Sequence, residues 1–127
     1  MTQTPLLGTR LYSRGMVLRG RMTIPRWKNF LVEAAEAMGM LPVAEAAVWN
    51  YPTPGGCGGN GATIIQPITE SFLALDVWTD HDGAYFFICS CREFFPATFR
   101  QVIAVFGLIE DDIGEPCMLR LDREGLA

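Results

Sequence analysis

A carboxylate, a hydroxyl and a thiol follow one another within a single stretch of β-prone sequence. Glu70 and Ser71 are adjacent, and Cys91 lies twenty residues beyond the serine. A serine hydroxyl can attack a neighbouring backbone carbonyl, and a thiol can donate a proton to a carbanion. These groups can cooperate only if the segments that carry them pair as adjacent strands. The stretch over residues 61–92 is therefore the candidate centre of any chemistry.

Other side chains near this stretch allow two interpretations each. Asp76 carries a carboxylate that could serve as a base or bind a cationic group, or it could be a solvated charge on a hairpin. Trp49 and Tyr51 could stack on an adenine or a guanidinium, although such aromatic residues more often pack in a core. Cys89 is typical of a small buried apolar residue. Ser71 itself could be an ordinary serine at the edge of a strand.

Two patterns that resemble ligand sites are incomplete. Cysteines at positions 57, 89, 91 and 117 are accompanied by one histidine, His81, so a zinc site has little support and we expect no metal. We expect His81 to be a solvated turn residue. The glycine-rich run over residues 52–61 precedes strand-like sequence, whereas a phosphate-binding loop needs Lys-Ser/Thr and a helix after it. We expect a mobile loop beside a site.

Composition limits the class of protein. The chain has 127 residues, of which 50% are hydrophobic and 19% charged, as expected for one globular domain. A net charge of −4 argues against nucleic-acid binding. No apolar run is long enough to span a membrane, and no signal-peptide core is evident. We therefore expect a cytoplasmic protein with reduced cysteines and no membrane partner.

Two helices are predicted from apolar residues that recur with helical spacing. Thr23 can cap the first helix, Pro25 suits its first turn, and Gly39 can end it. Its apolar stripe consists of Trp27, Phe30, Leu31, Ala34, Ala35 and Met38. The second helix is expected to begin at Pro96 and to end at Gly107. Its stripe consists of Phe95, Phe99, Val102, Ile103 and Phe106.

The remaining segments predict a sheet. We expect an N-terminal arm over residues 1–14 and a domain over residues 15–127. Alternating or β-branched runs predict strands over residues 15–22, 43–51, 62–70, 72–79, 84–91 and 115–122. The order is β-α-β-β-β-β-α-β, which favours an α+β fold, a two-layer sandwich with a largely antiparallel sheet and two helices on one face. The other face would carry Trp49, Tyr51, Trp78 and either Phe86 or Phe87, which indicates a homodimer.

The run TESFLALDVWTDHDGAYFFICSC, residues 69–91, resembles the core of the small prokaryotic S-adenosylmethionine decarboxylases, a pyruvoyl-dependent family. Glu70-Ser71 matches the dipeptide at which these enzymes cleave themselves, Trp78 matches their tryptophan, and Asp80 stands for their acidic residue. Cys91 has the family's spacing from the serine. The resemblance covers most of residues 15–122 and implies the fold predicted above.

This sequence differs from the family at positions close to the expected cleavage point and catalytic cysteine. Phe72 and Asp76 replace two histidines, the second of which is implicated in processing. Arg92 replaces the glycine that follows the cysteine. The hydroxyl residue that assists processing from the preceding strand would fall at Thr63.

The resemblance implies a self-processing enzyme. Attack of the Ser71 hydroxyl on the Glu70 carbonyl would convert the amide to an ester. Loss of the serine α-proton would expel Glu70 as a carboxylate, and hydrolysis of the resulting dehydroalanine would leave a pyruvoyl group. This cofactor would bind the substrate amine and accept electrons as CO₂ leaves. Cys91 would protonate the carbanion, with Asp76 in the place of the histidine, and Trp49, Tyr51 and Glu70 would bind substrate.

Three functions are consistent with these residues. The first is a decarboxylase of S-adenosylmethionine in polyamine biosynthesis, or of a basic amino acid. The second is a relative that keeps the fold and binds a small ligand but never cleaves itself. The third is an enzyme of S-adenosylmethionine breakdown that uses Glu70 or Asp76 as a base without a pyruvoyl group.

Overall fold

The computed structural model describes residues 9–51, 60–69, 71–79, 82–95, 97–111 and 117–121. The strands in these ranges are β1 (Thr9–Arg19), β2 (Ala47–Tyr51), β3 (Gly61–Ile68), β4 (Ser71–Trp78), β5 (Gly83–Ser90), β6 (Ile109–Asp111) and β7 (Cys117–Leu121). The helices are α1 (Ile24–Ala37) and α2 (Ala97–Val105).

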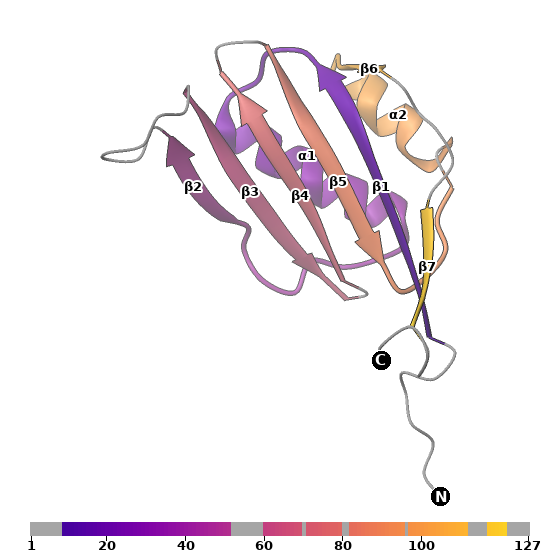
Figure 1. Ribbon diagram of the computed structural model, residues 1–127. Helices are drawn as coiled ribbons and strands as arrows, with labels where there is room; N and C mark the ends of the chain where they lie inside the picture. The colour runs from indigo at the N-terminus through magenta and orange to yellow at the C-terminus, as the bar shows by residue number, and fades with distance from the viewer. Residues whose placement is uncertain are drawn as a thin grey trace, which may run out of the picture.

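The described strands form one sheet in which every pair is antiparallel. The order is β2-β3-β4-β5-β1-β6, and β7 pairs with the other end of β1. Figure 1 shows both helices on the same side of the sheet, with α1 behind the middle strands and α2 close to β6. Helix α1 packs against β3, β4 and α2. The predicted α+β class, an antiparallel sheet with two helices on one face, is confirmed.

Helix α1 begins and ends where the sequence predicts. The Thr23 side chain accepts a hydrogen bond from the backbone N–H of Arg26 at 3.3 Å, and Pro25 lies in the first turn. Gly39 follows the helix with a φ of +76°, which a glycine adopts without steric strain. The predicted stripe is buried at Trp27, Phe30, Leu31, Ala34 and Ala35, while Met38 is the C-cap and is half-buried.

The core between the helices and the sheet centres on the ring of Phe30. This ring meets those of Trp27, Phe86 and Phe106 edge to face, with centroids 6.0, 5.1 and 5.5 Å away. Phe86 in turn contacts Phe99 of α2 at 5.8 Å. Such pairs stabilise a fold by about 0.5–1.5 kcal/mol each beyond the area they bury. The rings therefore join α1, β5 and α2 into one core.

Strands β3, β4 and β5 alternate between buried and more exposed side chains. The buried set, such as Leu73, Leu75 and Val77, belongs to the side covered by the helices. We call the opposite side of the sheet the open face. Its large exposed side chains, with exposed fractions, are Trp49 (52%), Tyr51 (41%), Phe72 (36%), Tyr85 (51%) and Phe87 (44%). Of the two phenylalanines left open by the sequence, Phe86 is the buried one.

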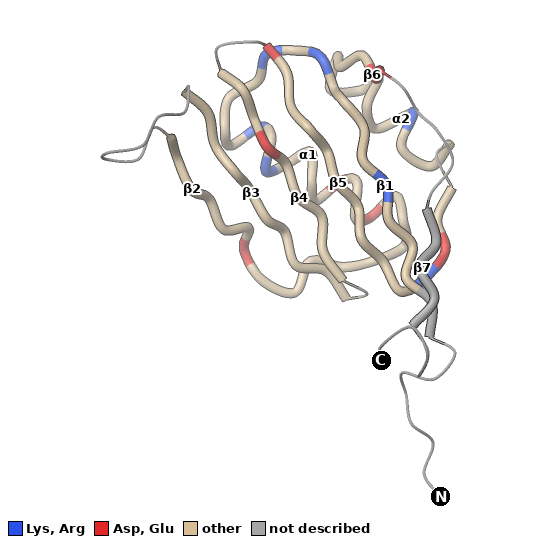
Figure 2. The backbone as a smooth tube through the Cα atoms, viewed as in Figure 1, with Lys and Arg blue, Asp and Glu red and all other residues tan. Residues whose placement is uncertain are grey.

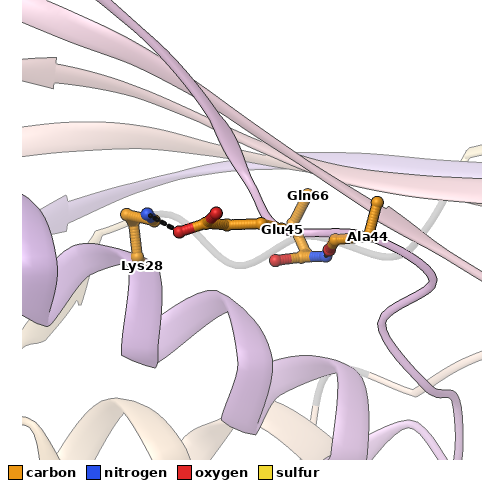
Figure 3. Close-up of polar contacts among 4 residues, drawn as sticks. All are labelled: Lys28, Ala44, Glu45 and Gln66. Carbon is orange, nitrogen blue, oxygen red and sulfur yellow. Dashed lines mark hydrogen bonds and ion pairs between the residues drawn. The ribbon is translucent and has the colours of Figure 1, made fainter.

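One buried amide connects the segment before β2 to the sheet. Gln66 on β3 is 1% exposed, and its side-chain nitrogen donates to the carbonyl of Ala44 at 2.8 Å (Figure 3). The same nitrogen donates to the carbonyl of Pro67 at 2.9 Å. The Lys28 ammonium of α1 forms an ion pair with Glu45 at 3.1 Å beside it. Satisfied buried amides fix the backbone that they contact. Residues 44–45 are thus held between α1 and the sheet.

Several predicted boundaries were wrong. The first strand begins at Thr9, inside the expected arm, and ends at Arg19. Its first residues pair with β7, a contact distant in sequence that local alternation does not reveal. Strand β6 was missed because it is three residues long. Strand β2 begins at Ala47, and residues 43–46 before it are not in a strand.

The second helix also differs in detail. Helix α2 begins at Ala97, and Phe95 lies outside it with 63% of its surface exposed. Phe94 is buried instead and packs edge-on against Phe99 at 5.8 Å. Pro96, the glycine-rich run over residues 52–59, Glu70, Asp80 and His81 lie outside the described residues.

Candidate active site

Strand pairing places Ser71 and Cys91 at the same end of the β4–β5 hairpin. Strand β4 begins at Ser71, whose register partner is Ser90, the last residue of β5. Cys91 directly follows Ser90 in the chain. We call Ser71, Ser90 and Cys91 the Ser71 end. Glu70, the other half of the expected cleavage dipeptide, lies outside the described residues.

The backbone of Ser71 adopts an unusual conformation. Its φ is +155°, which residues other than glycine rarely adopt, although the residue pairs in the sheet with both Ile68 and Ser90. A residue held in such a region costs of the order of 1–3 kcal/mol, and such residues cluster at functional sites. The torsion concerned belongs to the residue whose amide nitrogen would be cut. Backbone strain is therefore present at the position of the predicted cleavage.

Cys91 lies in a hydrogen-bonded turn that directly follows β5. The hydroxyl of the fully buried Ser90 donates to the carbonyl of Arg92 at 2.7 Å and accepts the Arg92 backbone N–H at 2.9 Å. Local serine-to-backbone bonds of this kind fix a turn. Cys91 is exposed, and neither it nor Cys89 forms a disulfide. Cys89 is half-buried at an open-face position, so the expectation of a buried residue was wrong.

A second group of candidates forms a row across the open face. Trp49, Thr63, Asp76 and Tyr85 are successive register partners on β2, β3, β4 and β5, and we call them the Asp76 row. The hydroxyl oxygens of Tyr51 and Thr63 lie 3.1 Å apart at one end of it. Asp76 is exposed and is the only charged residue in these four strands. Figure 2 shows it as the acidic segment within β4.

Within one chain, the Asp76 row and the Ser71 end are separate. Asp76 lies five residues along β4 from Ser71, a strand length of about 16 Å. The two residues also point to opposite sides by register, since Ser71 shares the alternation of the helix-facing Leu73 whereas Asp76 belongs to the open face. Asp76 and Thr63 are therefore not brought to the Ser71 backbone of their own chain.

A hollow of about 400 Å³ lies on the open face beside the Asp76 row. It is lined by Val17, Arg19, Trp78 and Gly83. Trp78 packs edge-on against Tyr85 at 4.9 Å, and Arg19 forms an ion pair with Asp111 at 2.8 Å. Because Gly83 has no side chain, the space between Trp78 and Arg19 stays open. Tyr85 and Arg19 were not among the predicted site residues; the alternation in β5 could have indicated Tyr85.

Among the described residues, no cluster of three or more His, Cys, Asp or Glu side chains could hold a metal ion. None of the helices described combines the length and the apolar composition needed to cross a membrane.

Comparison with known proteins yields a structural match without a sequence match. No protein-family model matches the chain, and no curated protein sequence matches it. The structure superposes on the crystal structure of the adenosylmethionine decarboxylase from Aquifex aeolicus VF5 with a TM-score of 0.58. The match covers 90% of this chain and 91% of that one, at 13% sequence identity. The chain has the adenosylmethionine decarboxylase fold. At this identity the likeness establishes the fold relationship alone.

Proposed function

We propose that the protein is a pyruvoyl-dependent decarboxylase that processes itself between Glu70 and Ser71 and acts on S-adenosylmethionine. The observation that carries the proposal is the strained φ of Ser71, at a strand end shared with Cys91, in a chain with the fold of an adenosylmethionine decarboxylase. An ordinary serine at the start of a strand has no need of such a torsion.

The cleavage would need only residues 70 and 71, a base that accepts the Ser71 α-proton, and water. The Ser71 hydroxyl attacks the carbonyl carbon of Glu70, and the C–N bond breaks as an ester forms. Removal of the Ser71 α-proton then releases the Glu70 carboxylate and leaves dehydroalanine. Water converts this residue to a pyruvoyl group with loss of ammonia. Relief of the torsion at Ser71 favours the first step, because the strained amide is replaced by a more flexible ester.

The Ser71 end fits such a group. The backbone on both sides is fixed, by the β3–β4–β5 pairing and by the turn from Ser90 to Arg92, so the position of residue 71 is defined. A pyruvoyl group supplies an electrophilic carbonyl for the amine of the substrate. Cys91, exposed at the same end, would deliver a proton to the carbon that loses CO₂.

The Asp76 row would be supplied by a second copy of the chain. Five large side chains on the open face are at least 36% exposed, and the helices cover only the other side. An apolar face of this kind favours association. A homodimer through the open face could bring the row of one subunit toward the Ser71 end of its partner. Such a dimer would bridge the separation of about 16 Å along β4, and the row would reach the Ser71 side chain, which points to the helix side, around the end of the strand.

The open face suits a cationic substrate with a flat ring. Asp76 provides one carboxylate among otherwise uncharged strands, and Trp49, Tyr85 and Tyr51 provide aromatic surfaces around it. A sulfonium or guanidinium group would be attracted by the carboxylate and by the ring faces. S-adenosylmethionine has both the cation and the ring, whereas a basic amino acid has only the cation.

Intact mass spectrometry of the purified protein tests self-processing directly. The proposal expects two chains, residues 1–70 and residues 71–127, the second blocked at its N-terminus by the pyruvoyl group. The Ser71→Ala variant should stay intact under the same conditions. An uncut wild-type chain after prolonged incubation would exclude the pyruvoyl mechanism.

A non-cleaving ligand-binding relative is the second candidate. It is favoured by one observation, that the carboxylate at Asp76 lies on the open face and away from Ser71. Such a protein would bind S-adenosylmethionine or another cation without cleavage. Binding by an uncut wild-type chain would select this candidate, and breakdown of the ligand by that chain would indicate an enzyme that uses Asp76 as its base.

A further inference from the structure

We propose that Arg92 is a positioning residue for Cys91, because its side chain ties the turn that carries the thiol to the C-terminal end of helix α1. The inference rests on the proposed role of Cys91. It assigns a function to a side chain that neither the cleavage nor the substrate contacts described above require.

The guanidinium of Arg92 caps α1. Its Nη2 donates to the carbonyl oxygens of Met38 and Gly39, both at 3.2 Å. The last carbonyls of a helix lack intrahelical partners and carry partial negative charge, which favours a cation there. Helix α1 has no basic residue in its own last turn. Arg92 therefore supplies, from more than fifty residues away, a charge that the helix itself lacks.

The same residue is also bound through its backbone. Both the N–H and the carbonyl of Arg92 are bonded to the hydroxyl of Ser90, which is fully buried. Cys91 thus lies between one neighbour fixed in the sheet and another fixed on the helix. A Cβ at Gly39 would lie 3.6 Å from Nη2, an ordinary van der Waals distance, so this contact does not depend on the missing side chain of the glycine.

Loss of the guanidinium should release one of these two anchors. The Ser90 bonds would remain, and Arg92 is exposed, so the core should not change. The thiol of Cys91 should then move over a wider range. The chemical reactivity of that thiol is a readout that does not depend on self-cleavage or on turnover.

The test compares Arg92→Met, which keeps the stem without donors, with Arg92→Lys, which keeps a cation. Each purified full-length protein is treated with iodoacetamide, and labelling at Cys91 and Cys89 is followed by peptide mass spectrometry. Arg92→Met should change the Cys91 rate by about threefold or more, the scale of losing one ordinary hydrogen bond. Cys89 should be unaffected, and Arg92→Lys should restore most of the wild-type rate.

Arg100→Met is the matched control, because Arg100 is an exposed arginine on α2 with a long 3.8 Å contact to Glu110. It should leave the Cys91 rate unchanged. An unchanged Cys91 rate in Arg92→Met would overturn the inference, as would equal changes at Cys89 and Cys91, which would indicate general loosening. If the protein proves to be processed, Arg92→Met should lower kcat with KM nearly unchanged. Because the labelling works on cut and uncut chains, its failure is distinguishable from failure of the proposed function.

Discussion

Thr63 lies directly opposite Asp76 in the β3–β4 register, and its hydroxyl is 3.1 Å from that of Tyr51. A carboxylate and two hydroxyl groups thus belong to neighbouring positions on a face whose other large side chains are mainly aromatic. Exposed polar groups at these positions remain available to a ligand. Their arrangement is consistent with the cationic ligand proposed above.

Replacing Asp76 by Asn should weaken binding of S-adenosylmethionine by about tenfold or more, since the substitution keeps the shape and removes the charge that pairs with the sulfonium. Stability should change by less than about 0.5 kcal/mol because the side chain is exposed. Titration calorimetry in an uncut Ser71→Ala background measures the affinity. Glu33→Gln, an exposed carboxylate on α1, is the control and should bind as wild type. Equal affinities for all three proteins would contradict a role for Asp76 in binding.

Replacing Ser71 by Gly should stabilise the uncut protein relative to Ser71→Ala. Glycine adopts a φ of +155° readily, whereas alanine carries the same steric conflict as serine. The difference in the free energy of unfolding should be about 1 kcal/mol or more, because strain relief exceeds the usual entropic cost of glycine. Urea denaturation of the two variants, neither of which can cleave, gives the comparison. A less stable glycine variant would show that residue 71 is not strained.

Replacing Cys91 by Ala should leave substrate binding largely intact and slow turnover by about 10² or more, the scale of losing a general acid. Misplaced protonation would also consume the cofactor, so the variant should inactivate after fewer turnovers. Cys89→Ala, two residues earlier and within β5, is the matched control, and it should cost less than about 1 kcal/mol because Cys89 is only half-buried. Normal turnover by Cys91→Ala, with slow turnover by Cys89→Ala, would assign the acid to the other thiol.

Replacing Phe87 by Glu should convert a wild-type dimer to a monomer, because the charge would be placed at the centre of the proposed apolar interface. Sedimentation velocity at micromolar concentration separates the two states. Val105→Glu is the control, since Val105 is also an exposed apolar residue, at 65%, but lies on α2 in the helix layer. A monomeric wild-type protein would remove the subunit interface from the proposal.

The sequence correctly predicted the helices and strands that are determined by residues close to one another in the chain. Helix α1 has its own cap, stripe and stop within sixteen residues of one another, so periodicity identified it. Strands β3, β4 and β5 alternate and follow one another as hairpins, so their pairing followed from their order. The bounds of β1 could not be predicted in this way, because they depend on pairing with β7 near the other end of the chain.

In the candidate site, too, the contacts set by local pairing could be predicted and the contacts between distant segments could not. Ser71 and Cys91 lie close together because the β4–β5 hairpin pairs residues at equal distances from its turn, and this register pairs Ser71 with Ser90. The separation of Asp76 from Ser71 follows from their spacing on one strand, because an interval of five residues sets the distance and puts the two side chains on opposite sides. This separation was not predicted from the sequence. The contact between Arg92 and the end of α1 joins a loop to a helix with no local pattern, and only the tertiary structure could reveal it.

The strand order has a consequence for what a cleaved protein would be. A break before Ser71 would leave β1, β2 and β3 on one polypeptide, and β4, β5, β6 and β7 on the other. Along the sheet these alternate, because β3 pairs with β4 while β1 is inserted between β5 and β6. The two polypeptides would be interleaved, and neither could leave without dismantling the hydrogen bonding on both sides of β1. Cleavage would then produce a permanently associated two-chain molecule that does not fall apart into fragments under native conditions.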